Sequence, residues 1–149
     1  MVLFNMSETI KATPAEVQKL LSDFESAPKR SNFWKSVRLV KHENDSSIYE
    51  TSEEVEGRRL KSTTRVTMQA QGRVDRIIEG DGEGSRLSYS ILPVPEGTKL
   101  SLEGELILPG FAQMLTGTAG KILGEIVEGR IEPMIRKELE IAKRILEKS

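Results

Sequence analysis

The sequence contains no cysteine and a single histidine, His42, among its 149 residues. The absence of cysteine excludes disulfide bonds, thiolate zinc sites and a cysteine nucleophile, and it fits a reducing compartment. His42 lies near the end of an expected strand, where the sequence indicates no partner that would orient it as a general base or a metal ligand. We therefore expect a surface histidine, no transition-metal site and no cofactor.

Long apolar runs are also absent. No run approaches the ~18 residues of a membrane-spanning helix, and the N-terminal segment MVLFNMSETIK turns polar too early for a signal peptide. The length of 149 residues fits one domain, covering residues 1–149, which is large enough to bury a hydrophobic core. These features predict a cytoplasmic protein without integral membrane association.

Aromatic side chains and an excess of one charge are scarce as well. Aromatic residues make up 5% of the chain, and 22 basic residues against 23 acidic ones leave a net charge of −1. Such a chain offers neither a basic groove nor a stacking platform, so nucleic acid is not an expected partner. Neighbouring carboxylates such as Glu53 and Glu54 alternate across a strand and face opposite sides, which argues against a two-carboxylate active site there.

Glycine is concentrated in the segment LTGTAGKILGEIVEG, residues 115–129, which looks like a nucleotide-binding loop. A phosphate-binding loop at Gly120 and Lys121 requires glycine five residues before Gly120 and serine or threonine after the lysine, but the sequence has Leu115 and Ile122 there. Each glycine inside a helix lowers helix stability by about 1 kcal/mol relative to alanine. The presence of several glycines in this segment therefore needs another explanation. Close packing on the sheet or a partner chain, loosely formed first turns, and room for a ligand all remain open.

The pattern of apolar residues predicts the element order β-α-α-β6-α, which belongs to the α+β class. Residues 2–10 alternate as a half-buried strand, and the segment TPAEVQKLLSDF begins with a capping box typical of a helix start. A second, short helical stretch is expected through Phe33 and Trp34. Turn residues divide 37–109 into six antiparallel strands, and residues 111–148 have the apolar spacing of a long amphipathic helix.

This order of elements, together with the opening IKATPAEVQKLLSDF, resembles the START and birch-pollen-allergen-like (SRPBCC) superfamily, especially its polyketide cyclase/dehydratase-like and lipid-transport branch. The positions that carry the resemblance are Ile10, Ala12, Pro14, Glu16, Val17, Trp34 and Val37. The resemblance covers essentially the whole chain. It implies a helix-grip fold, in which a curved antiparallel sheet of about seven strands wraps around the long C-terminal helix. It also implies an apolar cavity between sheet and helix, which members use for lipids, sterols, quinones or polyketides and a minority use for catalysis. The family has no shared catalytic motif, so the resemblance assigns no catalytic residue.

Strand parity indicates which side chains face the cavity that the resemblance implies. The apolar residues of its strand bring Glu53 inward. Val74 and Ile78 bring Arg76 inward, where it pairs with Glu53 or receives an anionic head group, unless a bulge turns it to solvent. Tyr89 is either a pocket residue with a hydroxyl for the ligand or an ordinary core tyrosine. The pocket candidates are Trp34, Tyr49, Glu53, Thr64, Met68, Arg76, Tyr89, Leu102, Leu106, Met114, Gly117, Gly120 and Ile126.

Three functions remain open. The first, which we expect, is binding or transport of a hydrophobic small molecule between the sheet and the C-terminal helix, with the segment 116–120 at the mouth of the cavity. The second is a cyclase- or dehydratase-like enzyme, which requires Tyr89, Arg76 or Glu53 to be buried with a perturbed pKa. The third is a protein-interaction module with a filled core, for which a homodimer is one form.

Overall fold

The computed structural model describes residues 2–55, 57–107 and 117–148, and the side chains of all of these except 2, 117–128 and 130. The elements in chain order are β1 (Val2–Ile10), α1 (Pro14–Ser22), the 3-10 helix η1 (Phe24–Lys29), β2 (Trp34–Glu43), β3 (Ser46–Val55), β4 (Arg58–Gln69), β5 (Gly72–Gly80), β6 (Arg86–Val94), β7 (Gly97–Leu106) and α3 (Gly117–Glu147).

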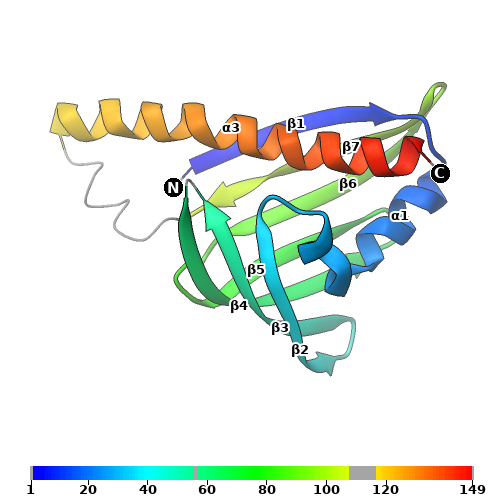
Figure 1. The fold of residues 1–149 in the computed structure, drawn as a ribbon, viewed down its shortest axis with the longest axis horizontal. Helices are drawn as coiled ribbons and strands as arrows, with labels where there is room; N and C mark the ends of the chain where they lie inside the picture. The colour runs from blue at the N-terminus through cyan, green and yellow to red at the C-terminus, as the bar shows by residue number, and fades with distance from the viewer. Residues whose placement is uncertain (1, 56, 108–116, 149) are drawn as a thin grey trace.

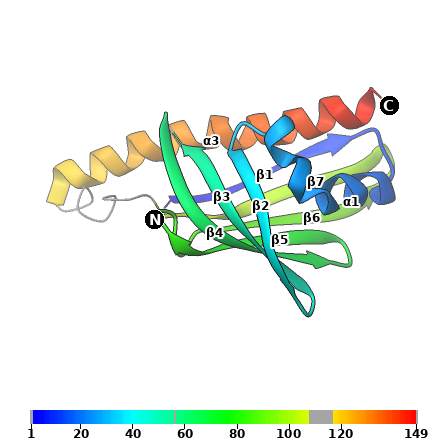
Figure 2. The same cartoon turned by 60° about the horizontal axis from the view of Figure 1, so that its bottom comes forward.

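In the described part of the chain, seven strands form one antiparallel sheet in the order β1-β7-β6-β5-β4-β3-β2. Consecutive strands from β2 to β7 are neighbours, as the turn spacing predicts, and β1 closes onto β7 at the opposite edge. The helix α3 lies along β1, with α1 beside its C-terminal end, while the hairpin β3–β4 extends toward α3 at the other end (Figures 1 and 2). The predicted α+β order of elements is confirmed.

The helix α1 begins where its capping box predicts. The Thr13 hydroxyl accepts a hydrogen bond from the Glu16 amide at 3.2 Å, and the Glu16 carboxylate accepts one from the Thr13 amide at 3.3 Å. The second helical stretch is misplaced in the sequence prediction. It is η1, which includes Pro28, whereas Trp34 already opens β2. The Ser31 hydroxyl accepts hydrogen bonds from the amides of Phe33 and Trp34. These two bonds stabilise the extended backbone at the start of β2 in place of a helix.

A half-buried carboxylate joins α3 to the segment just before β2. One oxygen of Glu138 accepts hydrogen bonds from the Ser31 hydroxyl at 2.7 Å and from the amides of Asn32 at 2.6 Å and Phe33 at 3.2 Å. Burial raises the pKa of Glu138, and these three donors favour its charged form. The contact therefore ties α3 to the segment that leads into the edge strand β2.

Most of the buried apolar side chains among the described residues form one cluster between the sheet and the helices. Ile131, Ile135 and Leu139 recur at steps of four along the buried stripe of α3. They pack with the inward residues of the sheet and with the aromatic rings of Phe24 and Trp34. The sequence pattern predicts Ile131 and Ile135 on this stripe, because their spacing repeats with the turn of a helix, whereas Leu139 was not among the predicted residues.

Close approach between strands requires glycine at Gly104. A side chain there would place its Cβ 1.9 Å from the backbone oxygen of Arg86 on β6, a distance that only movement of the backbone relieves. We expect Gly104→Ala to lower the free energy of unfolding by roughly 3 kcal/mol, because the strand pair must separate. Urea denaturation measures this loss.

The matched control is Gly129→Ala in α3. A Cβ at Gly129 meets nothing within 4 Å, so the same substitution should stabilise the helix by about 0.5–1 kcal/mol. Equal effects at the two positions would contradict the packing explanation for Gly104.

Candidate ligand-binding site

Glu53 is a carboxyl side chain buried on the inner face of the sheet. It lies near the end of β3 and is 0% exposed. The Thr51 hydroxyl donates a hydrogen bond to its Oε1 at 3.1 Å and lies 2.8 Å from the hydroxyl of Thr64 on β4. Its second oxygen, Oε2, is buried and has no hydrogen-bond partner among the described residues. A buried polar atom without a partner is uncommon in folded proteins and marks Glu53 as a candidate functional group.

The burial of Glu53 changes its acid–base behaviour. Removal from water raises its pKa to about 7, against which the nearby hydroxyls of Thr51 and Ser62 act only in part. A carboxyl with such a pKa exchanges its proton near neutral pH, which is the property that a general acid or base needs. The arrangement can therefore hold a proton or accept a hydrogen bond within an apolar interior.

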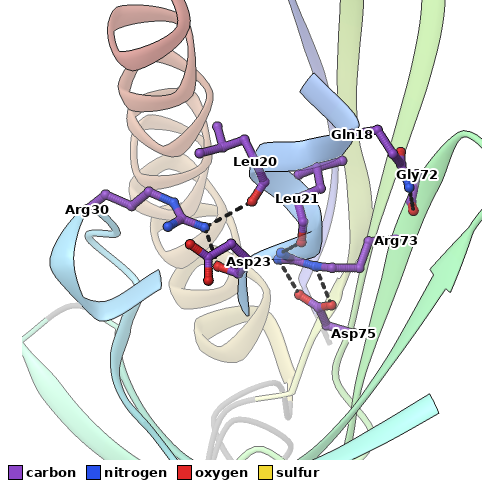
Figure 3. A network of polar contacts seen from close by, with 8 residues as sticks. All are labelled: Gln18, Leu20, Leu21, Asp23, Arg30, Gly72, Arg73 and Asp75. Carbon is purple, nitrogen blue, oxygen red and sulfur yellow. Dashed lines mark hydrogen bonds and ion pairs between the residues drawn. The ribbon is translucent and has the colours of Figure 1, made fainter. Parts of the chain in front are cut away.

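A second polar cluster lies at the opposite end, where α1 meets β5 (Figure 3). The Arg73 guanidinium donates two hydrogen bonds of 2.8 Å to the two carboxylate oxygens of Asp75, and a third of 2.8 Å to the carbonyl of Leu21. The same guanidinium lies 4.4 Å from the ring centre of Tyr89 and 5.0 Å from that of Phe24. This ion pair is satisfied within the protein, which is the condition for burying two charges.

Further donors from outside α1 meet the carbonyls at its end (Figure 3). Arg30 donates to the carbonyls of Leu20 at 3.2 Å and Asp23 at 2.8 Å. The last carbonyls of a helix have no partner within it, so these contacts and that of Arg73 satisfy them. At the other side of the helix the Gln18 amide donates to the carbonyl of Gly72. The cluster therefore anchors α1 to the sheet.

The interior beside the Arg73 cluster is almost filled. A cavity of about 40 Å³ lies between α1, α3 and the sheet, with Trp34, Arg73, Tyr89 and Glu138 in its wall. This space suits one or two water molecules, whereas small-molecule sites usually have ~300–1,000 Å³. Burial raises the pKa of Tyr89, so its hydroxyl stays protonated. This end of the interior is therefore too small for a lipid or a polyketide.

A larger hollow of about 720 Å³ lies on β2 to β5. Strand register places most of its side chains on the face opposite Glu53, among them the charged residues Arg38, Glu50 and Lys61. Arg38 and Glu50 form an exposed ion pair there. Because this surface is open and charged, it is unsuited to an apolar ligand.

The sequence prediction for β5 is wrong about which side chains face inward. Arg76, expected inside with Val74 and Ile78, is exposed, whereas Arg73 and Asp75 are buried. Two charges occupy the interior because their bidentate contact neutralises both. The alternation of Val74 and Ile78 indicated that their own face is buried. This rule counts only apolar residues, so it does not detect a buried ion pair on the opposite face. The signal that was available is the opposite charge of two residues spaced two apart on one strand.

The structure places the other candidates as follows. Trp34, Tyr49, Glu53, Thr64, Tyr89, Leu102 and Leu106 are buried on the inner face, and Met68 is half-buried. Met114 and Thr116 lie outside the described residues, as does the side chain of Ile126; Gly117 and Gly120 belong to the helical backbone of α3. Glu53 and Tyr89 belong to different polar clusters, so the structure does not combine them in one site. Glu138, from the half of α3 nearer the C-terminus, is a residue that sequence reasoning missed.

The described residues contain no cluster of three side chains suited to a metal ion. His42 is exposed, and its Nδ1 lies 2.8 Å from the Ser47 hydroxyl. Within the same residues, no helix has the length and apolar character needed to cross a membrane.

Comparison with known proteins identifies the family. A family model described as polyketide cyclase / dehydrase and lipid transport matches residues 1–147. The chain belongs to this family. A comparison with curated proteins finds no match.

Solved structures show the same architecture at low sequence identity. The di-domain aromatase/cyclase StfQ from the steffimycin biosynthetic pathway has a TM-score of 0.78 at 12% identity, over 99% of this chain and 51% of its own. The Zhui aromatase/cyclase from Streptomyces sp. R1128 has a TM-score of 0.76 at 13% identity, over 98% and 93%. A START superfamily protein from Mycobacterium smegmatis has a TM-score of 0.71 at 17% identity, over 98% and 97%. The family member described here thus has the helix-grip fold of the START/SRPBCC superfamily, and it spans about half the length of StfQ.

Burial of Glu53 predicts that stability falls as the pH rises. Its native pKa of about 7 exceeds the ordinary 4.5, so between these values the folded protein holds a proton that the unfolded chain has lost. The contribution of Glu53 to the free energy of unfolding is therefore fully present below pH 4.5. It decreases by roughly 1.4 kcal/mol for each pH unit between there and about pH 7. Glu53→Gln removes this titration, so the variant should be more stable than the wild type at pH 8. Urea denaturation at pH 5 and pH 8 measures the difference.

Glu50→Gln is the matched control, because Glu50 lies on the same strand but is exposed on the other face. It should keep the pH dependence of the wild type. Identical pH profiles for Glu53→Gln and the wild type would contradict the elevated pKa.

Removal of one partner of the buried ion pair should strongly lower the free energy of unfolding. Asp75→Asn leaves the Arg73 charge buried without its carboxylate, and we expect a loss of about 3–5 kcal/mol in the free energy of unfolding. Joint replacement of Arg73 and Asp75 by methionine and leucine should cost less than Asp75→Asn alone, since no charge is then left unpaired. Thermal denaturation compares the stabilities of the two variants. A double variant that is less stable than Asp75→Asn would contradict this expectation.

Proposed function

We propose that the protein binds a hydrophobic small molecule between the inner face of the sheet and α3, at the Glu53 end of the interior. The observation that carries this proposal is the Glu53 carboxyl, which is fully buried and has one oxygen without a partner among the described residues. Membership of a family described by polyketide chemistry and lipid transport supports the same class of ligand.

The surroundings of Glu53 suit a ligand that is mainly apolar. Leu60 lies directly opposite it on β4, and Val55 shares its face on β3. Burial of apolar ligand surface contributes about 25 cal/mol per Å², from which the cost of immobilising the ligand is subtracted. The filled cavity near Arg73 and the charged outer hollow leave the Glu53 end as the favoured position.

Glu53 would supply the polar contact that orients such a ligand. An unpaired buried group costs roughly 1–3 kcal/mol, and a hydrogen bond from the ligand recovers it. Apolar sites discriminate weakly between ligands of similar shape, whereas one buried polar group can select strongly. Glu53 therefore contributes to specificity more than to affinity.

Acid–base catalysis of the cyclase or dehydratase type is the second candidate, and the pKa of Glu53 favours it. A carboxyl that titrates at about 7 can remove a proton from a ligand carbon or hydroxyl and return it to a leaving hydroxyl. If this function applies, Glu53→Gln should abolish turnover of a bound polyketide and retain its binding, which a titration calorimeter and product analysis separate.

Native mass spectrometry of the purified protein, followed by organic extraction, tests the binding function. We expect a hydrophobic molecule at near-stoichiometric amount, or uptake of the neutral apolar probe N-phenyl-1-naphthylamine with increased fluorescence. A mass equal to the bare chain, together with no probe uptake, would overturn the proposal and favour the interaction module with a filled core. The same spectrum measures whether the chain forms a dimer.

A further inference from the structure

A row of arginines crosses three neighbouring strands of the sheet. The register places Arg65 of β4 directly opposite Arg76 of β5, and Arg76 directly opposite Arg86 of β6. Residues opposite each other in antiparallel strands present their side chains on one face, about 5 Å apart at Cβ. The row lies on the outer face, because the next residues along β4 and β6, Val66 and Leu87, are buried.

The middle arginine of this row lacks a counter-charge within the described part of the chain. Arg65 forms an ion pair with Glu43 at 3.1 Å, and Arg86 forms one with Glu103 at 3.5 Å. Arg76 lies between them, is exposed, and has no ion pair or side-chain hydrogen bond to any described residue. Like charges directly opposite each other destabilise a sheet. The ion pairs therefore hold the two flanking guanidinium groups, while the central one stays unpaired in an unfavourable position.

A bulge in β5 follows Arg76. The pairing between β4 and β5 passes over Ile78, which makes this residue an insertion between Arg76 and Glu79. Ile78 is 37% exposed, so the next side chain toward solvent along the strand is apolar and not acidic. Bulges redirect side chains and are frequent beside functional sites.

Hydroxyl groups lie on both sides of the strand next to Arg76. Thr67 of β4 and Ser88 of β6 are both opposite Val74, which is the outward position before Arg76 on β5. Hydroxyl groups can donate hydrogen bonds to an anion, as guanidinium groups do. An anion on Arg76 therefore has further donors on the two neighbouring strands.

The arrangement of these donors indicates the class of anion. A guanidinium is planar and binds two oxygens of one anion at once. A carboxylate has two oxygens in one plane and suits a single guanidinium, whereas a phosphate monoester offers three oxygens and nearly two negative charges. A phosphate can thus contact Arg76 and a neighbouring arginine together, and its charge offsets the repulsion in the row. The net charge of the chain is −1, so binding of an anion depends on this local row and not on a general positive field.

We propose that Arg65, Arg76 and Arg86 form a binding site for phosphate monoesters on the outer face of the sheet, with Arg76 at its centre. This site lies on the face opposite Glu53. It is separate from hydrophobic binding in the interior, so either function can fail without the other.

Isothermal titration calorimetry with phenyl phosphate and with benzoate, at pH 8 and low ionic strength, tests this site. The wild type should bind phenyl phosphate saturably, with one molecule for each chain. It should bind phenyl phosphate about tenfold more tightly than benzoate, because a second guanidinium adds charge-assisted hydrogen bonds to the phosphate.

A second measurement distinguishes a lipid phosphate from a soluble one. The protein is sedimented with phosphatidylcholine vesicles that contain or lack phosphatidic acid. Sedimentation that requires phosphatidic acid and is lost in Arg76→Gln assigns the site to a lipid phosphate. Binding of phenyl phosphate without such sedimentation assigns it to a soluble ester.

Two substitutions of Arg76 separate charge from geometry. Arg76→Gln should weaken binding of phenyl phosphate by about tenfold or more, since it removes the central charge-assisted hydrogen bonds. Arg76→Lys keeps the charge but not the planar fork, so its affinity should lie between those of Arg76→Gln and the wild type. Without phosphate, Arg76→Gln should unfold at a higher temperature than the wild type, because the repulsion in the row is removed.

The matched control is Arg38→Gln. Arg38 is exposed on the same outer face but is paired with Glu50, so this variant should bind phenyl phosphate as the wild type does. Equal losses in Arg38→Gln and Arg76→Gln would indicate general charge attraction and overturn the site.

Three further outcomes would overturn the inference: no saturable binding of phenyl phosphate by the wild type, equal affinities for phenyl phosphate and benzoate, or unchanged binding in Arg76→Gln. Arg76 is exposed, so its replacement leaves no buried group without a partner and the variant should fold. Uptake of N-phenyl-1-naphthylamine by the same variant measures hydrophobic binding separately and should equal that of the wild type.

Discussion

The buried ion pair between Arg73 and Asp75 is the contact on which the α1 end of the structure depends. Its guanidinium joins a strand carboxylate, the last turn of α1 and the faces of two aromatic rings. Each of these contacts would be weak in water, but in a nearly water-free interior they reinforce one another. Because α1 is attached to the sheet here, the interior at this end is closed and filled, and any ligand space must lie elsewhere.

The Arg73–Asp75 ion pair and Glu53 differ in whether their hydrogen bonds are complete. The guanidinium of the pair meets both carboxylate oxygens and a helix carbonyl, which is how proteins bury polar groups for structural purposes. At Glu53 one carboxylate oxygen lacks a partner within the described residues. A buried polar atom without a hydrogen-bond partner lowers stability, and proteins keep such atoms mainly at functional sites. This contrast, more than burial or charge, separates an anchor from a candidate binding site.

Much of the fold and part of the site could be predicted from the residues. The inward position of Glu53 followed from the alternation of its strand, because Tyr49 and Val55 on the same face are largely apolar. The same rule failed on β5, where the buried face contains Arg73 and Asp75. Alternation identifies the core face only when the buried side chains are apolar. The alternation rule does not detect a buried pair of opposite charges that neutralise each other.

The sequence by itself determined the order of elements, the start of α1 and the buried stripe of α3, because these depend on local spacing and on capping between residues three or four apart. Only the tertiary structure decided which strand positions lie opposite each other. The pairing of Trp34 with Glu53 depends on the register between β2 and β3, which includes an irregularity directly after Trp34. The closure of the α1 end depends on contacts between residues about 50 positions apart, such as Arg73 and Leu21. Register and long-range contacts arise from the packing of the whole chain, and local sequence does not encode them.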